Sequence, residues 1–554
     1  MKPLASIICT AVCTGLFSTA TIADTTIPVN LQTGWNSINT TTLKNDVTHL
    51  TSDRMQGRLS LTAGDNDAIH WLTKQFQAMG LKPAVGNSYL QAVKLIQYVP
   101  DRKKSYLQLE RGNEQATWIK PAVFTEFHRN IQLTGNVIFA GYGITAPDLH
   151  YDDYANIDAR GKIVMVFEHE PQETNPQSIF NGKANTCHAA NRVKALNAQR
   201  HGAIAIIVMP EPNRHHPSNQ ERFTRIGGSV TRKIPLPSQV REDDELQIPV
   251  VVISDQVANR IAGTGLSLSS LQSAIDRDLS PHSQLLPTTS ITLHDENKSR
   301  TFGTTYNVAG LLEGSDEKLK QETIIFSAHH DHDGMSEGKI WHGADDDASG
   351  SAGVLAIAKA YLANAAANNG LKPKRSLLFV IFAAEERGLL GAYYMAEHPL
   401  RPLATTRAMI NFDMIGRNEE KSIQTNDIID IPADTSNRLN LTGVHYSPDY
   451  ASTVAQQNQY TGLILDDRFD NEPALNVFFR SDQFPFVLHG IPAFWWFTGF
   501  HPDYHQTTDT ADKLNYGKMQ KILRLAYLTG YVFANEMQTP SFIKNPKPTN
   551  GTSS

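Results

Sequence analysis

Histidine and acidic side chains are concentrated in two neighbouring motifs, HHDHD at residues 329–333 and GADDDASG at residues 343–350. An apolar, β-rich segment precedes the first motif at 323–328, and an alanine-rich helical pattern follows the second from 351 to about 367. The acidic and imidazole groups therefore fall between a strand and a helix, at the edge where open α/β sheets bind ligands. Borderline divalent metals such as zinc prefer such a mixed ligand set. This spacing favours a hydrolase that uses two metal ions.

Three further groups follow apolar strands later in the chain. Glu385 and Glu386 follow a predicted strand, Asp413 follows the next one, and His505 lies on a loop before the final predicted helix at 516–537. Taken singly, each has an ordinary structural explanation, such as an acid that stabilises a helix N-terminus or a histidine at the surface. Four such groups at strand ends of one α/β pattern indicate a metal site.

The elements that would position these groups alternate between strands and helices. After residue 300, strands are predicted at 307–312, 323–328, 376–382 and 408–412. A helical pattern separates most successive pairs, so we predict an α/β fold whose mainly parallel, mixed sheet is flanked by helices. Nearer the N-terminus, an amphipathic helix is predicted at 67–79, with Gly80 at its C-terminal end.

The character of the sequence changes between residues 133 and 279. Apolar strand-like runs there are separated by turns rich in Gly, Pro and Asp, and one helix is predicted at about 185–201. We therefore predict a β-rich domain inserted into the host fold. His215 and His216 lie on a polar loop of this segment. They are either metal ligands or, in the interpretation we prefer, part of a solvated loop.

Charge and cysteine content restrict the possible partners and the compartment. A net charge of −6 over 554 residues argues against a nucleic-acid partner, which requires a basic surface. Residues 1–23 have the features of a secretory signal peptide, because one lysine precedes an apolar stretch and small residues precede Asp24. The alternative is an uncleaved N-terminal anchor. We expect an exported protein, periplasmic or secreted, with no membrane attachment after signal removal. Cys187 would then be its only cysteine, so no internal disulfide is expected.

The motifs together resemble the di-zinc aminopeptidase family, which includes bacterial leucyl-type and Streptomyces-type aminopeptidases, glutamate carboxypeptidase and the non-enzymatic transferrin receptor. The resemblance rests on AHHD at 328–331, GADDDASG at 343–350, AEERGL at 384–389, FDM at 412–414 and YHQTTDT at 504–510. FAGYGI at 139–144 and YDDY at 151–154 resemble a protease-associated domain. The implied fold is zinc-exopeptidase-like with this domain inserted. The expected divisions are a signal peptide at 1–23, an N-terminal part of the peptidase domain at 24–132, the insert at 133–279, the catalytic domain at 280–538 and a polar tail at 539–554.

The resemblance implies two zinc ions per chain. Asp346 would bridge both ions, His329 and Asp413 would complete one site, and Glu386 and His505 would complete the other. A carboxylate shared between two ions holds them close enough to act on one attacking water.

The resemblance also implies three catalytic roles. Glu385 would be the general base, Asp331 would orient the imidazole of His329, and Tyr504 would steady the oxyanion. Gln483 stands where many members of the family have histidine, which leaves the substrate side of the site open. Aromatic residues just before Tyr504 either line a pocket for the first side chain or form core; they are Trp495, Trp496, Phe497 and Phe500.

The expected activity is the removal of N-terminal residues from peptides that have a free N-terminus. One alternative is a carboxypeptidase or dipeptidase on the same scaffold, which would need a cationic cluster to hold a carboxylate. A second is a metal-free binding module like the receptor relative, and a third is a one-metal glutaminyl cyclase.

Overall fold

The computed structural model describes residues 26–120, 122–214, 216–217, 221, 234–370 and 372–547. The predicted signal peptide at 1–23 and the last part of the predicted tail lie outside these residues. None of the helices in the described part of the chain is long and apolar enough to cross a membrane.

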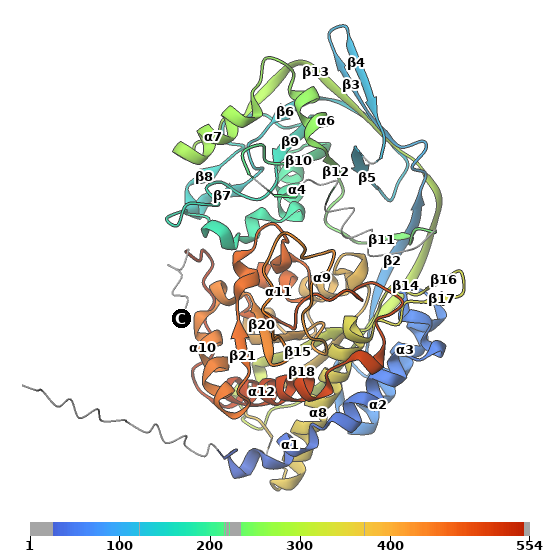
Figure 1. The fold of residues 1–554 in the computed structure, drawn as a ribbon, viewed down its shortest axis with the longest axis vertical. Helices are drawn as coiled ribbons and strands as arrows, with labels where there is room; N and C mark the ends of the chain where they lie inside the picture. The colour runs from blue at the N-terminus through green and yellow to red at the C-terminus, as the bar shows by residue number, and fades with distance from the viewer. Residues whose placement is uncertain are drawn as a thin grey trace, which may run out of the picture.

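A ten-stranded sheet forms the lower body of the molecule (Figure 1). Its central strands run in the order β14 (Asn297–Leu312), β18 (Ser376–Phe382), β15 (Thr323–His329), β19 (Thr406–Phe412) and β22 (Ala493–Phe497). β15 pairs in parallel with both β18 and β19, and β19 pairs in parallel with β22. On one side of this parallel group, β14 pairs with β18 in antiparallel fashion. On the other side, β20 (Arg438–Thr442) pairs with β22 in antiparallel fashion. The prediction of an α/β fold with a mixed sheet is therefore confirmed, and the parallel pairs lie at the centre of that sheet.

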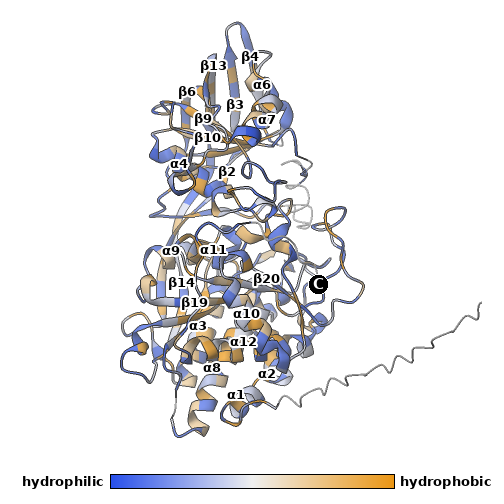
Figure 2. Ribbon diagram, turned by 90° about the vertical axis from the view of Figure 1, so that its left-hand side faces the viewer, coloured by the Kyte–Doolittle hydropathy of each residue, from blue (hydrophilic) through white to orange (hydrophobic). Residues whose placement is uncertain are grey.

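Helices cover both faces of this sheet, which is why β15, β18 and β22 are buried along their whole length. On β15, Phe326 packs into a core shared with α8 (Gly350–Ala367) and α12 (Tyr516–Asn535). Its neighbour Ile325 points to the opposite face, toward α9 (Leu390–Glu397) and α11 (Gln483–Leu488). Apolar residues gather on α8 and α12 in Figure 2. Burial on both faces fixes the positions at which the strands end.

The N-terminal helices pack on the α8 side of the sheet. α3 (Ala63–Met79) ends at Gly80, which adopts a left-handed φ of 79°, as predicted. α2 (Thr40–Leu50) buries one apolar stripe in the same core. Between them, a short helical segment at Asp53–Arg58 carries Arg58 into the interior.

An eight-stranded sheet forms the upper body in Figure 1. Four of its strands run side by side and in parallel: β6 (Ile131–Phe139), β9 (Ile163–Phe167), β10 (Ala205–Met209) and β12 (Val250–Ile253). The expected helix of the insert begins only at Asn191, as α4 (Asn191–Arg200), after a short turn of 3-10 helix. The apolar cores of the eight-stranded sheet are separate from those of the ten-stranded sheet.

The two sheets divide the chain in their own way. Strands β3 to β5, which lie within residues 106–125, and β13 (Gln284–Asp295) belong to the eight-stranded sheet. β11 (Ser238–Arg241) instead pairs with β2 (Leu90–Pro100) at the edge of the ten-stranded sheet. The domain boundaries at 133 and 279 therefore stay a prediction. Because β11 pairs with β2 in the ten-stranded sheet, the two bodies are linked more closely than a simple insertion would link them.

Candidate metal centre

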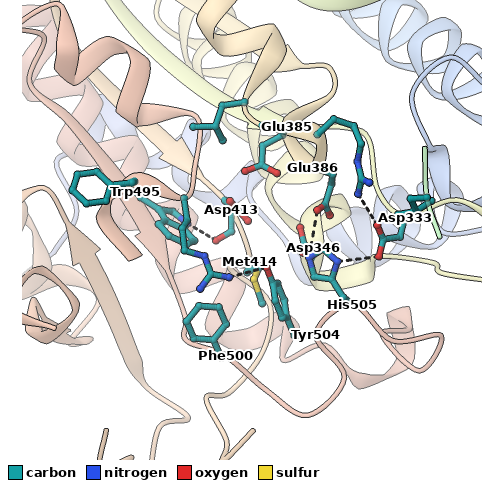
Figure 3. A pocket seen from close by; sticks show the side chains of 16 residues that line it. Asp333, Asp346, Glu385, Glu386, Asp413, Met414, Trp495, Phe500, Tyr504 and His505 are labelled. Atoms are coloured by element: carbon teal, nitrogen blue, oxygen red, sulfur yellow. Dashed lines mark hydrogen bonds and ion pairs between the residues drawn. The ribbon is translucent and has the colours of Figure 1, made fainter. Parts of the chain in front are cut away.

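The predicted site residues meet where the parallel strands of the ten-stranded sheet end. His329 is the last residue of β15, Asp413 follows β19 directly, and Glu385 and Glu386 lie in the turn after β18. Parallel strands end at one edge of a sheet, so residues far apart in sequence become neighbours there. Figure 3 shows most of these side chains around one cavity.

The carboxylate of Asp346 lies between two imidazoles. Its Oδ1 is 3.4 Å from Nε2 of His329, and its Oδ2 is 3.3 Å from Nε2 of His505. On one side, Oδ1 of Asp413 lies 3.7 Å from the same nitrogen of His329. On the other, Oε2 of Glu386 lies 3.3 Å from the same nitrogen of His505. All five side chains that the sequence put forward as metal ligands thus come together in two half-sites that share Asp346.

The spacing of these atoms fits metal ions better than direct hydrogen bonds. The Nε2 atom of His329 is buried and makes no hydrogen bond within the described part of the chain, although carboxylates surround it. Two ligand atoms that share one tetrahedral zinc ion, with bonds of about 2.0–2.2 Å, are separated by roughly 3.4 Å. The observed separations of 3.3 to 3.7 Å lie close to that value. The donor set, imidazole nitrogen and carboxylate oxygen, also suits zinc.

The buried negative charges of the centre raise the pKa of an imidazole and of a carboxyl group alike. Burial alone would lower the pKa of His329, but the carboxylates of Glu385, Asp346 and Asp413 outweigh it and raise that pKa well above its usual value. Burial raises the pKa of Glu385 well above its usual range, and Asp413 adds to the effect. Such excess negative charge in a buried cluster calls for a cation.

Glu385 lies at the centre without facing both imidazoles. Its Oε2 is 3.8 Å from Nε2 of His329, and no comparable contact joins it to His505 among the ion pairs of the described residues. It also lines the cavity, whereas Asp331 does not. A carboxylate beside the ligands, open to the cavity and with a perturbed pKa, suits proton transfer.

Asp331 supports the centre through a different group from the one expected. Nδ1 of His329 lies 3.1 Å from the backbone carbonyl of Asp331, while the carboxylate is 3.8 Å away. That carboxylate instead accepts hydrogen bonds from the backbone N–H groups of Glu385 and Glu386, at 2.9 and 3.3 Å. Asp331 therefore orients the imidazole by its main chain and the Glu385-Glu386 turn by its side chain.

Sequence reasoning gave no role to Asp333, which orients the second imidazole. Its Oδ2 lies 2.9 Å from Nδ1 of His505, and its Oδ1 accepts a hydrogen bond of 2.9 Å from Arg387. Carboxylates that hold the far nitrogen of a ligating histidine fix its tautomer and orientation. Asp333 is the last residue of the HHDHD motif, but its partner His505 is 172 residues away in the sequence, so the motif alone does not indicate the pairing.

Two further aspartates accept hydrogen bonds from backbone N–H groups around Asp346. Asp509 accepts hydrogen bonds from the backbone N–H groups of Asp345 and Asp346, at 3.0 and 3.3 Å. Asp347 accepts from the N–H groups of His329 and Gly350, at 3.1 and 2.8 Å. The three consecutive aspartates at 345–347 therefore have different contacts, and of the three only Asp346 directs its carboxylate to both His329 and His505.

The other histidines near the centre differ in their contacts. His332 lies 2.7 Å from Oε1 of Glu386 through Nδ1, close enough to be a further ligand or to support Glu386. His330 turns away, toward Asp65 and the backbone carbonyl of Tyr306, and His342 contacts the carbonyl of Thr51. Of the three, only His332 belongs to the centre.

The centre opens into a cavity of about 470 Å³. Tyr504 lines it, and its hydroxyl accepts a hydrogen bond of 3.2 Å from Arg480, which also stacks over Phe500. Burial raises the pKa of Tyr504 to about 12, so the phenol remains protonated and able to donate. The apolar part of the lining comes from Leu236, Leu389, Met414, Phe479, Trp495 and Phe500.

The aromatic residues before Tyr504 divide between pocket and core. Trp495 and Phe500 line the cavity (Figure 3), whereas Trp496 packs in the core between the sheet and α12. Gln483 does not reach the cavity, because its side chain is buried and donates to the carbonyl of Phe478 at 2.9 Å. The departure at Gln483 therefore affects the packing of α11 more than the substrate side.

Two family models match the chain. Residues 307–529 match Peptidase family M28, and residues 133–261 match the PA domain. Leucine aminopeptidase 2 of Arthroderma otae is 27% identical over 249 residues, which cover 41% of this chain and 44% of that protein. Leucine aminopeptidase 2 of Trichophyton rubrum is 28% identical over 236 residues, 39% of this chain and 42% of that protein. The chain thus spans less than half the length of these two relatives. The solved aminopeptidase of Aneurinibacillus sp. strain AM-1 aligns over 94% of this chain and 98% of its own, at 17% identity and a TM-score of 0.49.

Proposed function

We propose, from the matches of residues 307–529 to Peptidase family M28 and of residues 133–261 to the PA domain, that the chain is a zinc-dependent aminopeptidase with two zinc ions per chain. The observation that carries the proposal is the carboxylate of Asp346, which faces His329 at 3.4 Å and His505 at 3.3 Å. Asp413 and Glu386 complete the two half-sites.

We assign the metal ligands on this geometry. Asp346 would be shared, His329 and Asp413 would hold one ion, and Glu386 and His505 would hold the other. Zinc, when bound, polarises a carbonyl oxygen and lowers the pKa of a bound water to about 7. Asp331 and Asp333 keep the two imidazoles in the ligating orientation.

Glu385 would transfer the proton. It lines the cavity beside the ligands, and burial raises the affinity of its carboxylate for a proton, so the carboxylate can take a proton from the attacking water and pass it to the leaving amine. The Tyr504 hydroxyl, fixed by Arg480, would donate a hydrogen bond to the developing oxyanion. The apolar lining around Trp495 and Phe500 suits an uncharged first side chain.

The alternatives make different demands on the same cavity. A carboxypeptidase or dipeptidase needs cations for a terminal carboxylate, and Arg387 and Arg480 line the cavity. Arg387 is held by Asp333, and Arg480 contacts Tyr504, so both already support the centre. A metal-free binding module would not need all five ligand side chains, and a one-metal cyclase would not need both half-sites.

A panel of aminoacyl chromogenic substrates, with free and with blocked N-termini, tests the proposal. We expect hydrolysis of free substrates with apolar first residues, loss on treatment with a chelator, and recovery with zinc. Cleavage of blocked substrates alone would favour the carboxypeptidase alternative. Retention of full activity without metal would exclude the zinc mechanism. We also propose export, to be tested by fractionating cells and sequencing the mature N-terminus, which we expect near Asp24.

A further inference from the structure

A second group of histidine and glutamate side chains lies in the eight-stranded sheet, away from the centre described above. His169 and Glu173 follow β9, and Glu211 and His216 follow the neighbouring parallel strand β10. The loops after two adjacent parallel strands meet at one edge of the sheet, just as they do in the ten-stranded sheet. From this geometry we propose that these four residues hold a structural zinc ion.

The four side chains form two facing pairs. Nδ1 of His169 lies 2.8 Å from Oε2 of Glu211, and Nε2 of His216 lies 2.7 Å from Oε2 of Glu173. The two imidazole rings are 4.5 Å apart between centroids. One ligand atom from each residue lies within 4.8 Å of all the others. Two imidazoles and two carboxylates at that spacing supply the four ligands of a closed, tetrahedral zinc site.

Burial separates this cluster from an ordinary surface ion pair. The side chains of His169 and Glu211 are 2% and 1% exposed, and those of His216 and Glu173 are 12% and 6% exposed. His216 is thus largely buried, which corrects the solvated loop expected from the sequence; His215 lies outside the described residues. Buried carboxylates need compensation by a cation or by hydrogen bonds.

A buried carboxylate oxygen of Glu211 is available to bind a cation. Oε1 of Glu211 is buried and makes no hydrogen bond within the described part of the chain. The nearby cation is Arg214, whose Nε lies 3.6 Å from that oxygen and 3.4 Å from Oε2 of Glu173. The other two guanidinium nitrogens, Nη2 and Nη1, lie 3.2 and 3.5 Å from the carboxylate of Asp276. Arg214 therefore reduces the charge of the cluster without saturating it.

A cavity at the junction of the two bodies gives an ion access to this cluster. Glu173 and His216 line a cavity of about 430 Å³ whose other wall includes Asp427, Asn471 and Glu472, from loops of the ten-stranded body. An ion can reach the cluster through this cavity without unfolding the chain. Once bound, it would join the two loops at the face of the eight-stranded body that meets the catalytic part.

Zinc content measured on the full chain tests the proposal. Glu173→Gln and His216→Ala should each remove one zinc per chain relative to the wild type, while cleavage of a free aminoacyl substrate stays near the wild-type rate. His282→Ala is the matched control, because His282 pairs with Asp278 in the same body at 3.2 Å but is about one-third exposed. It should keep the full zinc content. Equal zinc in the wild type and Glu173→Gln would overturn the proposal.

A second measurement isolates the proposed site. In the His329→Ala/His505→Ala double variant, which removes two ligands of the catalytic centre, added cobalt should still give the absorption of a tetrahedral ion. Addition of Glu173→Gln to that background should abolish the signal. Its absence in the double variant itself would also overturn the proposal. Because Glu173→Gln is nearly isosteric, thermal unfolding then distinguishes loss of the ion from loss of the fold.

Discussion

Nδ1 of His505 lies 2.9 Å from Oδ2 of Asp333, and this contact turns the other ring nitrogen toward Asp346 and Glu386, each at 3.3 Å. Replacing Asp333 by Asn should weaken metal binding at that half-site by about 10–100-fold, because the imidazole loses the group that fixes its tautomer. Zinc titration of the metal-depleted protein measures the effect. Asp503→Asn is the control, since its carboxylate contacts Thr508, Lys513 and Arg417 instead of an imidazole of the centre. Equal loss in both variants would contradict a specific role for Asp333.

The adjacent acids Glu385 and Glu386 should respond differently to the same change. Glu385→Gln should keep the zinc content and lower kcat by about 10²–10⁴-fold, because the proton acceptor is lost while the proposed ligands remain. Glu386→Gln should lose zinc, since its Oε2 lies 3.3 Å from Nε2 of His505 in the second half-site. Zinc analysis beside steady-state kinetics separates the two. Loss of zinc from Glu385→Gln would show that the two roles are reversed or shared.

Tyr504→Phe removes the hydroxyl that receives a hydrogen bond of 3.2 Å from Arg480. We expect kcat to fall by about 10²-fold with little change in KM, because a donor aimed at the oxyanion acts mainly in the transition state. Burial holds the pKa of this phenol at about 12, so the loss should be the same from pH 6 to pH 9. A rise in KM at constant kcat would instead make Tyr504 a contact for bound substrate.

Arg58 should be important for stability. It is fully buried and donates hydrogen bonds of 2.7 to 2.9 Å to the carbonyls of four residues, which are Leu50, His330, His342 and Gly343. Arg58→Met would remove all four of these hydrogen bonds and should cost about 3 kcal/mol or more of unfolding free energy. Arg54→Met removes an exposed pair with Asp67 and should cost less than about 1 kcal/mol. Similar midpoints of thermal unfolding for the two variants would contradict this.

Asp153 should make stability depend on pH. Burial raises its pKa from the usual 3.8 to about 7, so the folded chain binds more protons than the unfolded chain between these values. The contribution of Asp153 to stability is therefore present at low pH and is lost as the pH rises toward 7. The gap in Tm between the wild type and Asp153→Asn should be larger at pH 5 than at pH 8.

Asp158 provides the control for this titration. Its hydrogen bonds from Arg160 lower its pKa to about 2, so it is ionised in both states across the same range. The gap in Tm between the wild type and Asp158→Asn should not change between pH 5 and pH 8. A constant gap for Asp153→Asn as well would show that the buried carboxyl does not titrate in this window.

The sequence by itself identified the ends of the central strands and the residues that follow them. Continuous apolar runs marked β15, β18 and β19, and polar groups had to come after each run because the interior cannot hold them unpaired. Parallel pairing then places those ends at one edge, so the convergence of His329, Glu386 and Asp413 followed from the pattern. The same periodicity located α3 and its end at Gly80.

Only the tertiary structure decided which of these groups contact one another. The pairing of Asp333 with His505, the reach of Arg58 to Gly343 and the exchange of β11 into the first sheet join residues that are distant in the chain. So does the cluster around Glu211, which reads in sequence as two separate loops. Periodicity specifies which face of an element is buried, whereas contacts between loops depend on how whole elements pack. Which loops come into contact is therefore decided by the packing of the whole fold, and the local sequence pattern does not specify it.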